Sequence, residues 1–126
     1  MRIRELNIFD EFATVNKENV FEAAKIMKEN NVPDLVLVNN DKKPLGIIST
    51  VDIVMKIMAE GKDPNTTKIA SIARKVKSFS DEALREEVYE YMMETNSELV
   101  PIVKKDGTLL GVCTIGDILI EVEDEK

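Results

Sequence analysis

The chain has 126 residues, of which 44% are hydrophobic and 33% are charged, and its formal net charge at neutral pH is −7. This composition is typical of a globular chain, and the length suits one domain or two small lobes that share a core. The negative charge argues against broad binding to nucleic acids or to anionic membranes, because both depend on clustered Lys and Arg. The sequence has no histidine and one cysteine, so the usual general base and zinc ligands are missing and catalysis is not expected.

The sequence also carries an expectation about cellular location. No apolar run approaches the roughly 20 residues that span a bilayer, and the first residues lack the apolar core of a signal peptide. Cys113 lies within an apolar strand pattern, which indicates a small buried side chain rather than a reactive thiol. We therefore expect a cytoplasmic protein.

The first half of the chain predicts a strand, a helix, two strands and a second helix. Asn19 followed by Glu22 forms a capping-box pattern at the start of the first helix, and Pro33 cannot continue that helix. A continuous apolar run then predicts a strand covered on both faces, and Gly61 closes the second helix. The expected elements are a strand at residues 13–15, a helix at 20–30, strands at 35–38 and 45–48, and a helix at 51–60.

The second half repeats this order. The expected elements are a strand at residues 78–79, a helix at about 81–94, strands at 100–103 and 109–113, and a closing helix from residue 115. Leu84 is expected on the buried side of the first of these helices. The offset between the copies is 65 residues from Gly46 to Gly111 but 64 from Val15 to Phe79, which places one extra residue in that helix.

Each copy is preceded by a short apolar segment. Ile3 and Leu6 precede the first copy, and Ile69 and Ile72 precede the second. The spacing predicts short helical lead-ins, each packed on the neighbouring unit.

The repeats define the expected domain organisation. The first repeat takes residues 1–61, a connection with a turn at 63–65 takes residues 62–67, and the second repeat takes residues 68–126. In a strand–helix–strand–strand–helix repeat the helices cover one face of the sheet, so neither half is expected to be stable alone. The expected fold is α/β, with two pseudo-symmetric β-α-β-β-α repeats packed through their sheets.

One eight-residue pattern occurs twice, at residues 46–53 and 111–118. Both copies read glycine, two apolar residues, a hydroxyl residue, two spacers, aspartate and isoleucine. Ser49 with Asp52, and Thr114 with Asp117, then fall where a strand ends and a helix begins. One interpretation is an ordinary helix cap with an acid in the first turn. The other is a nucleotide site, in which the hydroxyl and backbone N–H groups hold a phosphate and the carboxylate accepts ribose hydroxyls.

These residues resemble a tandem pair of cystathionine-β-synthase (CBS) domains, known as a Bateman module. The octet above is the family's signature, and Val100-Pro101-Ile102-Val103 matches its apolar-Pro-apolar-Val strand. The resemblance covers essentially residues 1–120. It implies clefts between the repeats that bind AMP, ADP, ATP or S-adenosylmethionine, and it implies assembly as a homodimer.

The resemblance also implies two ligand sites, each with residues from both repeats. One joins Thr114 and Asp117 to three residues that line the adenine pocket: Thr14, Leu35 and Val36. Its pseudo-symmetric partner joins Ser49 and Asp52 to Ser78, Val100 and Pro101.

The two expected sites are not equivalent. The first copy has Val36 where the second has Pro101, and the charge of Asp34 disfavours a phosphate near the Thr114–Asp117 site. A basic run precedes the second repeat's first strand, and it is either a phosphate-facing patch for the Ser49–Asp52 site or a solvated linker; its members are Arg74, Lys75 and Lys77. If one site binds phosphate tightly, we expect the Ser49–Asp52 site to be that one.

The expected function is a non-catalytic regulatory module that binds an adenosine-containing ligand, needs no cofactor and signals to a separate protein. The alternative is a ligand-free dimerisation or protein-interaction module. An enzyme acting on a nucleotide and a nucleic-acid binder are weaker alternatives, because the chain has no phosphate loop and no metal-ligand cluster, and carries net negative charge.

Overall fold

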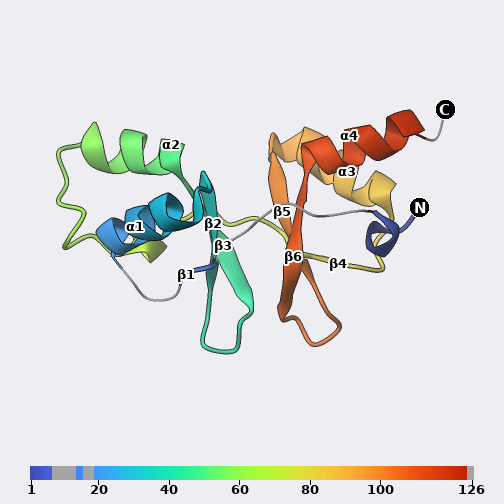
Figure 1. The fold of residues 1–126 in the computed structure, drawn as a ribbon, viewed down its shortest axis with the longest axis horizontal. Helices are drawn as coiled ribbons and strands as arrows, with labels where there is room; N and C mark the ends of the chain where they lie inside the picture. The colour runs from blue at the N-terminus through green and yellow to red at the C-terminus, as the bar shows by residue number, and fades with distance from the viewer. Residues whose placement is uncertain (7–13, 16–18, 125–126) are drawn as a thin grey trace. The chain divides into compact units, whose positions relative to one another are not determined.

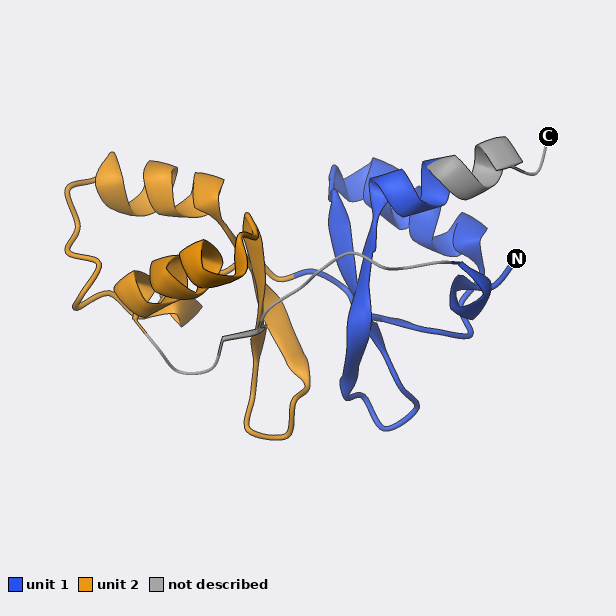
Figure 2. Ribbon diagram, viewed as in Figure 1, with its two compact units in different colours: residues 1–10, 76–126 blue, residues 11–75 orange. Residues whose placement is uncertain are grey.

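A computed structural model describes residues 1–6, 14–15 and 19–124, with side chains described for residues 1–6 and 19–119 (Figure 1). The chain divides into two compact units (Figure 2). We call residues 11–75 (orange) the first unit and residues 1–10 with 76–126 (blue) the second unit, the reverse of the numbers in the key of the figure. Each unit contains a three-stranded mixed sheet. The expected α/β class with a repeated β-α-β-β-α order is confirmed.

In the first unit, a parallel strand pair and a hairpin make the sheet. β1 (Thr14–Val15) pairs in parallel with β2 (Asp34–Val38), which pairs antiparallel with β3 (Pro44–Ser49). The helix α1 (Val20–Asn30) and the short helix α2 (Thr50–Ile53) lie on the same side of this sheet (Figure 1). A π-helical turn, η2 (Val54–Met58), continues α2.

Local signals set the ends of α1 as predicted. The Asn19 side chain accepts a hydrogen bond from the Glu22 amide at 2.9 Å, which satisfies one unpaired N–H of the first turn. Asn31 takes the left-handed conformation at φ 53°, and the Val32 amide returns to the Met27 carbonyl at 3.1 Å. The helix α1 therefore ends at Asn30, as predicted.

The second unit repeats the arrangement with β4 (Phe79–Ser80), β5 (Leu99–Val103) and β6 (Leu109–Thr114). Its helices are α3 (Arg85–Thr95) and α4 (Ile115–Asp124). Cys113 is fully buried, as predicted.

The extra residue of the second copy lies before its first helix, not in it. α1 and α3 each have 11 residues and begin 65 residues apart. The predicted start at about residue 81 was wrong, because Ser80 forms a turn: its side chain accepts from the Glu82 amide and its carbonyl from the Ala83 amide. Leu84 consequently precedes the helix and is 38% exposed, not buried as expected.

The two lead-ins are short 3₁₀ helices, η1 (Ile3–Glu5) and η3 (Ile69–Ser71), and each packs on the other repeat as predicted. Ile3 and Leu6 are buried among side chains of the second repeat. Ile69 and Ile72 are buried among side chains of α1, β2 and β3. Because a fully buried isoleucine contributes roughly 1.5–3 kcal/mol, the lead-ins belong energetically to the units they pack on. The compact units therefore differ from the predicted repeats of residues 1–61 and 68–126, because each lead-in belongs to the unit of the other repeat.

Two further features complete the fold. Asp63 accepts hydrogen bonds from the Asn65 and Thr67 amides, which makes the predicted turn in the connection. No helix among the described residues is long and apolar enough to cross a membrane.

Candidate functional site

The Ser49–Asp52 pair is a reciprocal helix cap at the corner between β3 and α2. The Ser49 hydroxyl accepts from the Asp52 amide at 3.2 Å, and the Asp52 carboxylate accepts from the Ser49 amide at 3.0 Å. The Ser49 hydroxyl also donates to the same carboxylate oxygen at 3.0 Å. The capping interpretation is thus confirmed, and a ligand role has to be compatible with these bonds.

Two cations also contact Asp52. Arg74 Nε lies 3.3 Å from Oδ2, and Lys56 Nζ lies 3.3 Å from Oδ1. The carboxylate side chain is only 8% exposed, whereas those of Arg74 and Lys56 are 49% and 42% exposed. Lys56 was not among the residues predicted for this site. Its position four residues after Asp52 on a helix was the signal that could have found it.

Ser49, Arg74 and Lys56 together keep Asp52 ionised; we call these four residues the Asp52 cluster. Burial raises the pKa of the Asp52 carboxyl, but hydrogen bonds from Ser49 and the charges of Arg74 and Lys56 together outweigh burial and hold the pKa below its usual value of 3.8. The buried corner therefore carries a fixed negative charge at neutral pH, with two half-exposed cations around it.

Backbone pairing brings Arg74 to this corner. The Ile47 amide donates to the Arg74 carbonyl at 2.9 Å, and the Arg74 amide donates to the Ile47 carbonyl at 2.8 Å. Lys56 Nζ also donates to the Ile72 carbonyl at 3.0 Å. Residues 72–74 are thus bound to β3 and to Lys56.

Among the predicted phosphate-binding residues, Arg74 contacts Asp52. The Lys77 amide donates to the Tyr91 hydroxyl at 2.9 Å, and its ammonium group lies 4.9 Å from the centre of the Phe79 ring. Lys75 is exposed, as the solvated-linker interpretation expects. The three basic residues thus have different surroundings, and their role in binding a phosphate stays a prediction.

The Thr114–Asp117 pair repeats the cap at the corner between β6 and α4. Asp117 Oδ2 accepts from the Thr114 amide at 2.9 Å, and the Thr114 hydroxyl accepts from the Asp117 amide at 3.2 Å. Both residues are half-buried, so this carboxylate is more accessible than that of Asp52. At the 65-residue offset, Glu121 occupies the position of Lys56.

The strand residues predicted to line an adenine lie at equivalent places in the two sheets. Thr14 pairs with Val36, and Ser78 directly precedes Phe79, which pairs with Ile102. Leu35, Val36, Val100 and Pro101 are buried and Ser78 is half-buried. The members of each predicted site come from different compact units, so their grouping stays a prediction.

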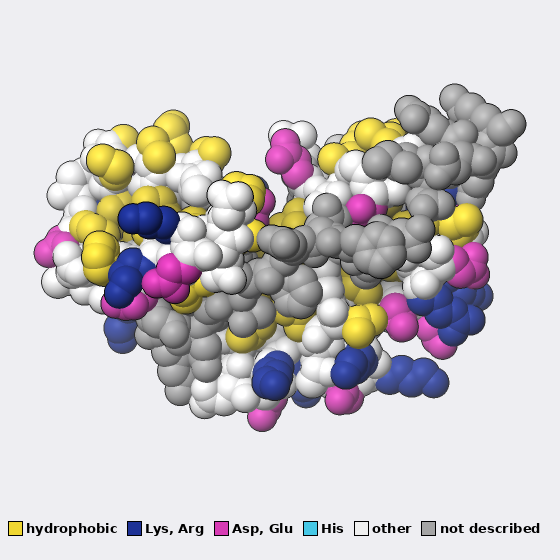
Figure 3. Space-filling model, in the orientation of Figure 1, with side chains coloured by type: hydrophobic (Ala, Val, Ile, Leu, Met, Phe, Trp, Pro, Cys, Tyr) yellow, Lys and Arg dark blue, Asp and Glu magenta, His cyan; other side chains and the backbone are white. Residues whose placement is uncertain are grey.

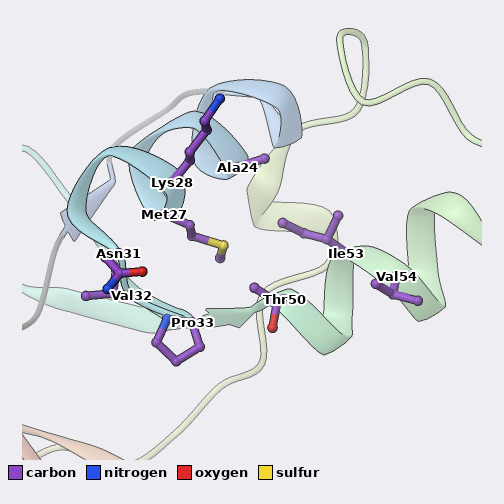
Figure 4. A pocket seen from close by; sticks show the side chains of 9 residues that line it. All are labelled: Ala24, Met27, Lys28, Asn31, Val32, Pro33, Thr50, Ile53 and Val54. Carbon is purple, nitrogen blue, oxygen red and sulfur yellow. The ribbon is translucent and has the colours of Figure 1, made fainter.

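A separate apolar groove of about 510 Å³ lies beside α1 and α2 in the first unit (Figure 4). Met27 and Ile53 contribute side chains to it, and so do Pro33 and Val54. Neither Ser49 nor Asp52 lines this groove. Its apolar lining suits a hydrophobic side chain better than a phosphate.

No group of three or more His, Cys, Asp or Glu side chains that could hold a metal ion occurs in the part of the chain that the structure describes.

This chain belongs to the CBS domain family, because the family's model matches residues 5–59 and 69–124, which contain the two repeats and both capped corners. The chain is 33% identical to YlbB of Bacillus subtilis over 128 residues, which covers 99% of this chain and 84% of that protein. It is 31% identical to an uncharacterized protein of Methanopyrus kandleri over 81% of this chain, but it spans only 53% of that relative.

Solved structures of this fold include ligand complexes. A CBS domain protein from Pyrobaculum aerophilum complexed with AMP matches 98% of this chain and 99% of its own, at 26% identity and a TM-score of 0.83. The CBS domain pair of protein MJ0100, complexed with 5′-methylthioadenosine and S-adenosyl-L-methionine, matches 100% of this chain and 98% of its own, at 25% identity and a TM-score of 0.81. A hexameric CBS-CP12 protein from bloom-forming cyanobacteria also shares the fold, at 28% identity and a TM-score of 0.78, over 100% of this chain and 75% of its own.

Two relatives carry enzyme names, a homoserine O-acetyltransferase of Methanococcus vannielii and an inosine-5′-monophosphate dehydrogenase of Methanocaldococcus jannaschii. This chain covers 22% of each. The shared part is therefore a minor portion of either enzyme.

Proposed function

We propose that this chain is a regulatory module that binds an adenosine-containing ligand at the corners marked by Ser49–Asp52 and Thr114–Asp117, and signals occupancy to a separate protein without catalysing a reaction. The observation that carries the proposal is the recurrence of a capped hydroxyl–carboxylate pair at the same strand-to-helix corner in both repeats. The AMP and S-adenosylmethionine complexes of related folds support adenosine as the common chemical feature.

The chemistry of the corners fits this ligand class. An ionised carboxylate accepts several hydrogen bonds, so either aspartate suits the vicinal hydroxyls of a ribose. Asp117 is the more accessible of the two, whereas Arg74 and Lys56 add positive charge near Asp52. We therefore assign the more highly phosphorylated ligand to the Ser49–Asp52 site. Thr14 and Ser78, with the strand starts at Leu35–Val36 and Val100–Pro101, are the proposed adenine contacts.

The absence of catalysis is part of the proposal. It rests on the lack of any histidine in the sequence and on the small share of the enzyme relatives that this chain matches. Signalling must then pass through a change in contacts with another protein.

We further propose that the chain forms a homodimer through α2 and η2. Val51, Val54, Met55 and Met58 follow helical spacing and are 51–73% exposed, and they gather on the surface of the first unit beside the apolar groove (Figure 3). A surface that carries both exposed apolar side chains and an apolar groove can pair with itself in a two-fold dimer. This face is also the observation that favours the second candidate function, a ligand-free interaction module.

A thermal-shift panel tests the ligand proposal. AMP, ADP, ATP and S-adenosylmethionine are each added at millimolar concentration, and a ligand that binds only the folded state raises the melting temperature by mass action. We expect at least one to do so, with a smaller rise in Asp117→Ala or Asp52→Ala. Asp41→Ala, in the exposed β2–β3 turn, is the matched control and should respond as the parent does. Melting temperatures unchanged by all four ligands would leave the interaction module as the better account.

A further inference from the structure

The carboxylate of Asp52 already has cationic or hydrogen-bonding neighbours from its own chain at both oxygens. Oδ2 accepts from the Ser49 amide at 3.0 Å, from the Ser49 hydroxyl at 3.0 Å and from Arg74 Nε at 3.3 Å, and Oδ1 lies 3.3 Å from Lys56 Nζ. The carboxylate side chain is only 8% exposed, which leaves little room for a further donor. A ligand hydroxyl that bonds to this buried group therefore competes with these neighbours.

The four donors differ in how readily they can leave. Those of Ser49 are held by the end of β3 and the cap of α2, so their loss would unwind the corner. Arg74 and Lys56 reach Asp52 with long side chains that are about half exposed, so both charged groups can turn into water at little cost. A ligand therefore displaces the cations first.

Both cations also bind residues 72–74 to the first unit. Lys56 Nζ donates to the Ile72 carbonyl, and Arg74 itself belongs to the segment, which pairs with Ile47 of β3. The next residues lead directly to residue 76, where the chain passes from one compact unit to the other. Loss of the two ion pairs would weaken the attachment of this segment at its last residues.

We propose that Asp52 exchanges two sets of donors. Without ligand, the ion pairs of Asp52 with Arg74 and Lys56 hold residues 72–74 against β3; we call this arrangement the latch. A ligand that donates ribose hydroxyls to Asp52 displaces both cations and loosens residues 72–74. The ligand half of the proposal rests on the proposed function, whereas the latch does not. In the second copy the position of Lys56 is taken by Glu121, so this cation is particular to the first copy.

The latch is tested first without any ligand. Asp52→Asn keeps the shape of the side chain and an acceptor for the Ser49 amide, but it removes the charge that holds Arg74 and Lys56. Amide hydrogen exchange of Ile47 and Arg74, followed by NMR in the full chain, should accelerate about three- to tenfold more than that of the α1 amides, which report any general loss of stability. Asp41→Asn is the matched acid-to-amide control. Exchange at Ile47 and Arg74 equal to that of the parent would overturn the latch.

A second variant covers general destabilisation. If Asp52→Asn accelerates exchange in α1 as well, Lys56→Met carries the test, because it leaves the Ser49–Asp52 cap intact. Faster exchange at Arg74 with α1 unchanged supports the latch, and unchanged exchange at Arg74 overturns it.

The ligand half is tested with ATP in an Asp117→Ala background, which leaves Asp52 as the ribose acceptor. Saturating ATP should raise the melting temperature yet accelerate exchange at Ile47 and Arg74. Unchanged or slower exchange with ATP bound overturns the coupling, and so does loss of ATP binding in this background while the parent still binds it. If the parent binds none of the four adenosine ligands, the proposed function fails together with the coupling, while the Asp52→Asn result still decides the latch.

Discussion

Gly46 and the carbonyl oxygen of Arg74 approach so closely that a β-carbon on Gly46 would lie 2.7 Å from that oxygen. The first residue of the repeated octet is therefore a glycine because the backbone of another segment crosses it, not because of its own dihedral angles. The same crossing carries the Arg74 side chain to Asp52. Gly46 thus leaves room for residues 72–74 beside β3, and Asp52 forms an ion pair with Arg74 of the same segment.

Replacing Gly46 by alanine should push residues 72–74 away from β3. We expect Gly46→Ala to lower the free energy of unfolding by about 1–3 kcal/mol, the usual range for overpacking, as measured by urea denaturation. Gly116→Ala is the control, since its added β-carbon would meet its nearest neighbour at 3.6 Å, an ordinary contact. A Gly46→Ala protein as stable as the parent would contradict the steric argument.

The Asp52 cluster predicts how stability depends on pH. Because the pKa of Asp52 is lower in the folded state, its stabilisation is complete above the unfolded-state value near 3.8 and is lost as the pH falls through the folded-state pKa. Asp52→Asn should therefore be less stable than the parent at pH 7, by about 1–3 kcal/mol, the usual cost of breaking hydrogen bonds to a charged group. The difference should shrink below pH 3.8. Urea denaturation of both proteins across this pH range measures it, and a difference independent of pH would contradict the prediction.

The exposed methionines of η2 provide a test of the proposed dimer. Met58 is 73% exposed, so Met58→Lys should leave the monomer folded while weakening self-association at least about tenfold. Sedimentation equilibrium measures the change. Thr66→Lys, at an exposed turn outside this face, provides a charge-matched control. Equal association of Met58→Lys and the parent would exclude this face as the interface.

The left-handed helix ends predict a paired effect. Asn31 and Asn96 close α1 and α3 with φ values of 53° and 54°. Asn31→Gly and Asn96→Gly should each be neutral or stabilising, whereas Asn31→Val and Asn96→Val should each lose about 1–2 kcal/mol, because a β-branched side chain clashes in this conformation. Thermal unfolding of the four variants provides the comparison, and equal stability of the glycine and valine variants would contradict it.

Several parts of the fold were predictable because their causes are local. Asn19 caps α1 through Glu22, three residues away, and the Ser49–Asp52 and Thr114–Asp117 caps have the same spacing. The start of α3 was mispredicted because the Ser80 turn and a helix from residue 81 compete for the same backbone amides. Periodicity alone does not decide such a competition.

The duplicated order of strands and helices and both capped corners could be read from the amino-acid sequence, because they depend on neighbours within a few positions. Three features could be seen only in the packed chain: Arg74 contacts Asp52, Lys56 completes the ion cluster, and Gly46 makes room for the crossing segment. Arg74 lies 22 residues from Asp52 in the chain, and a contact of that separation forms only when the sheet and the lead-in pack together. Residue spacing predicts a local cap, but the donors that surround a buried carboxylate are selected by the packed fold.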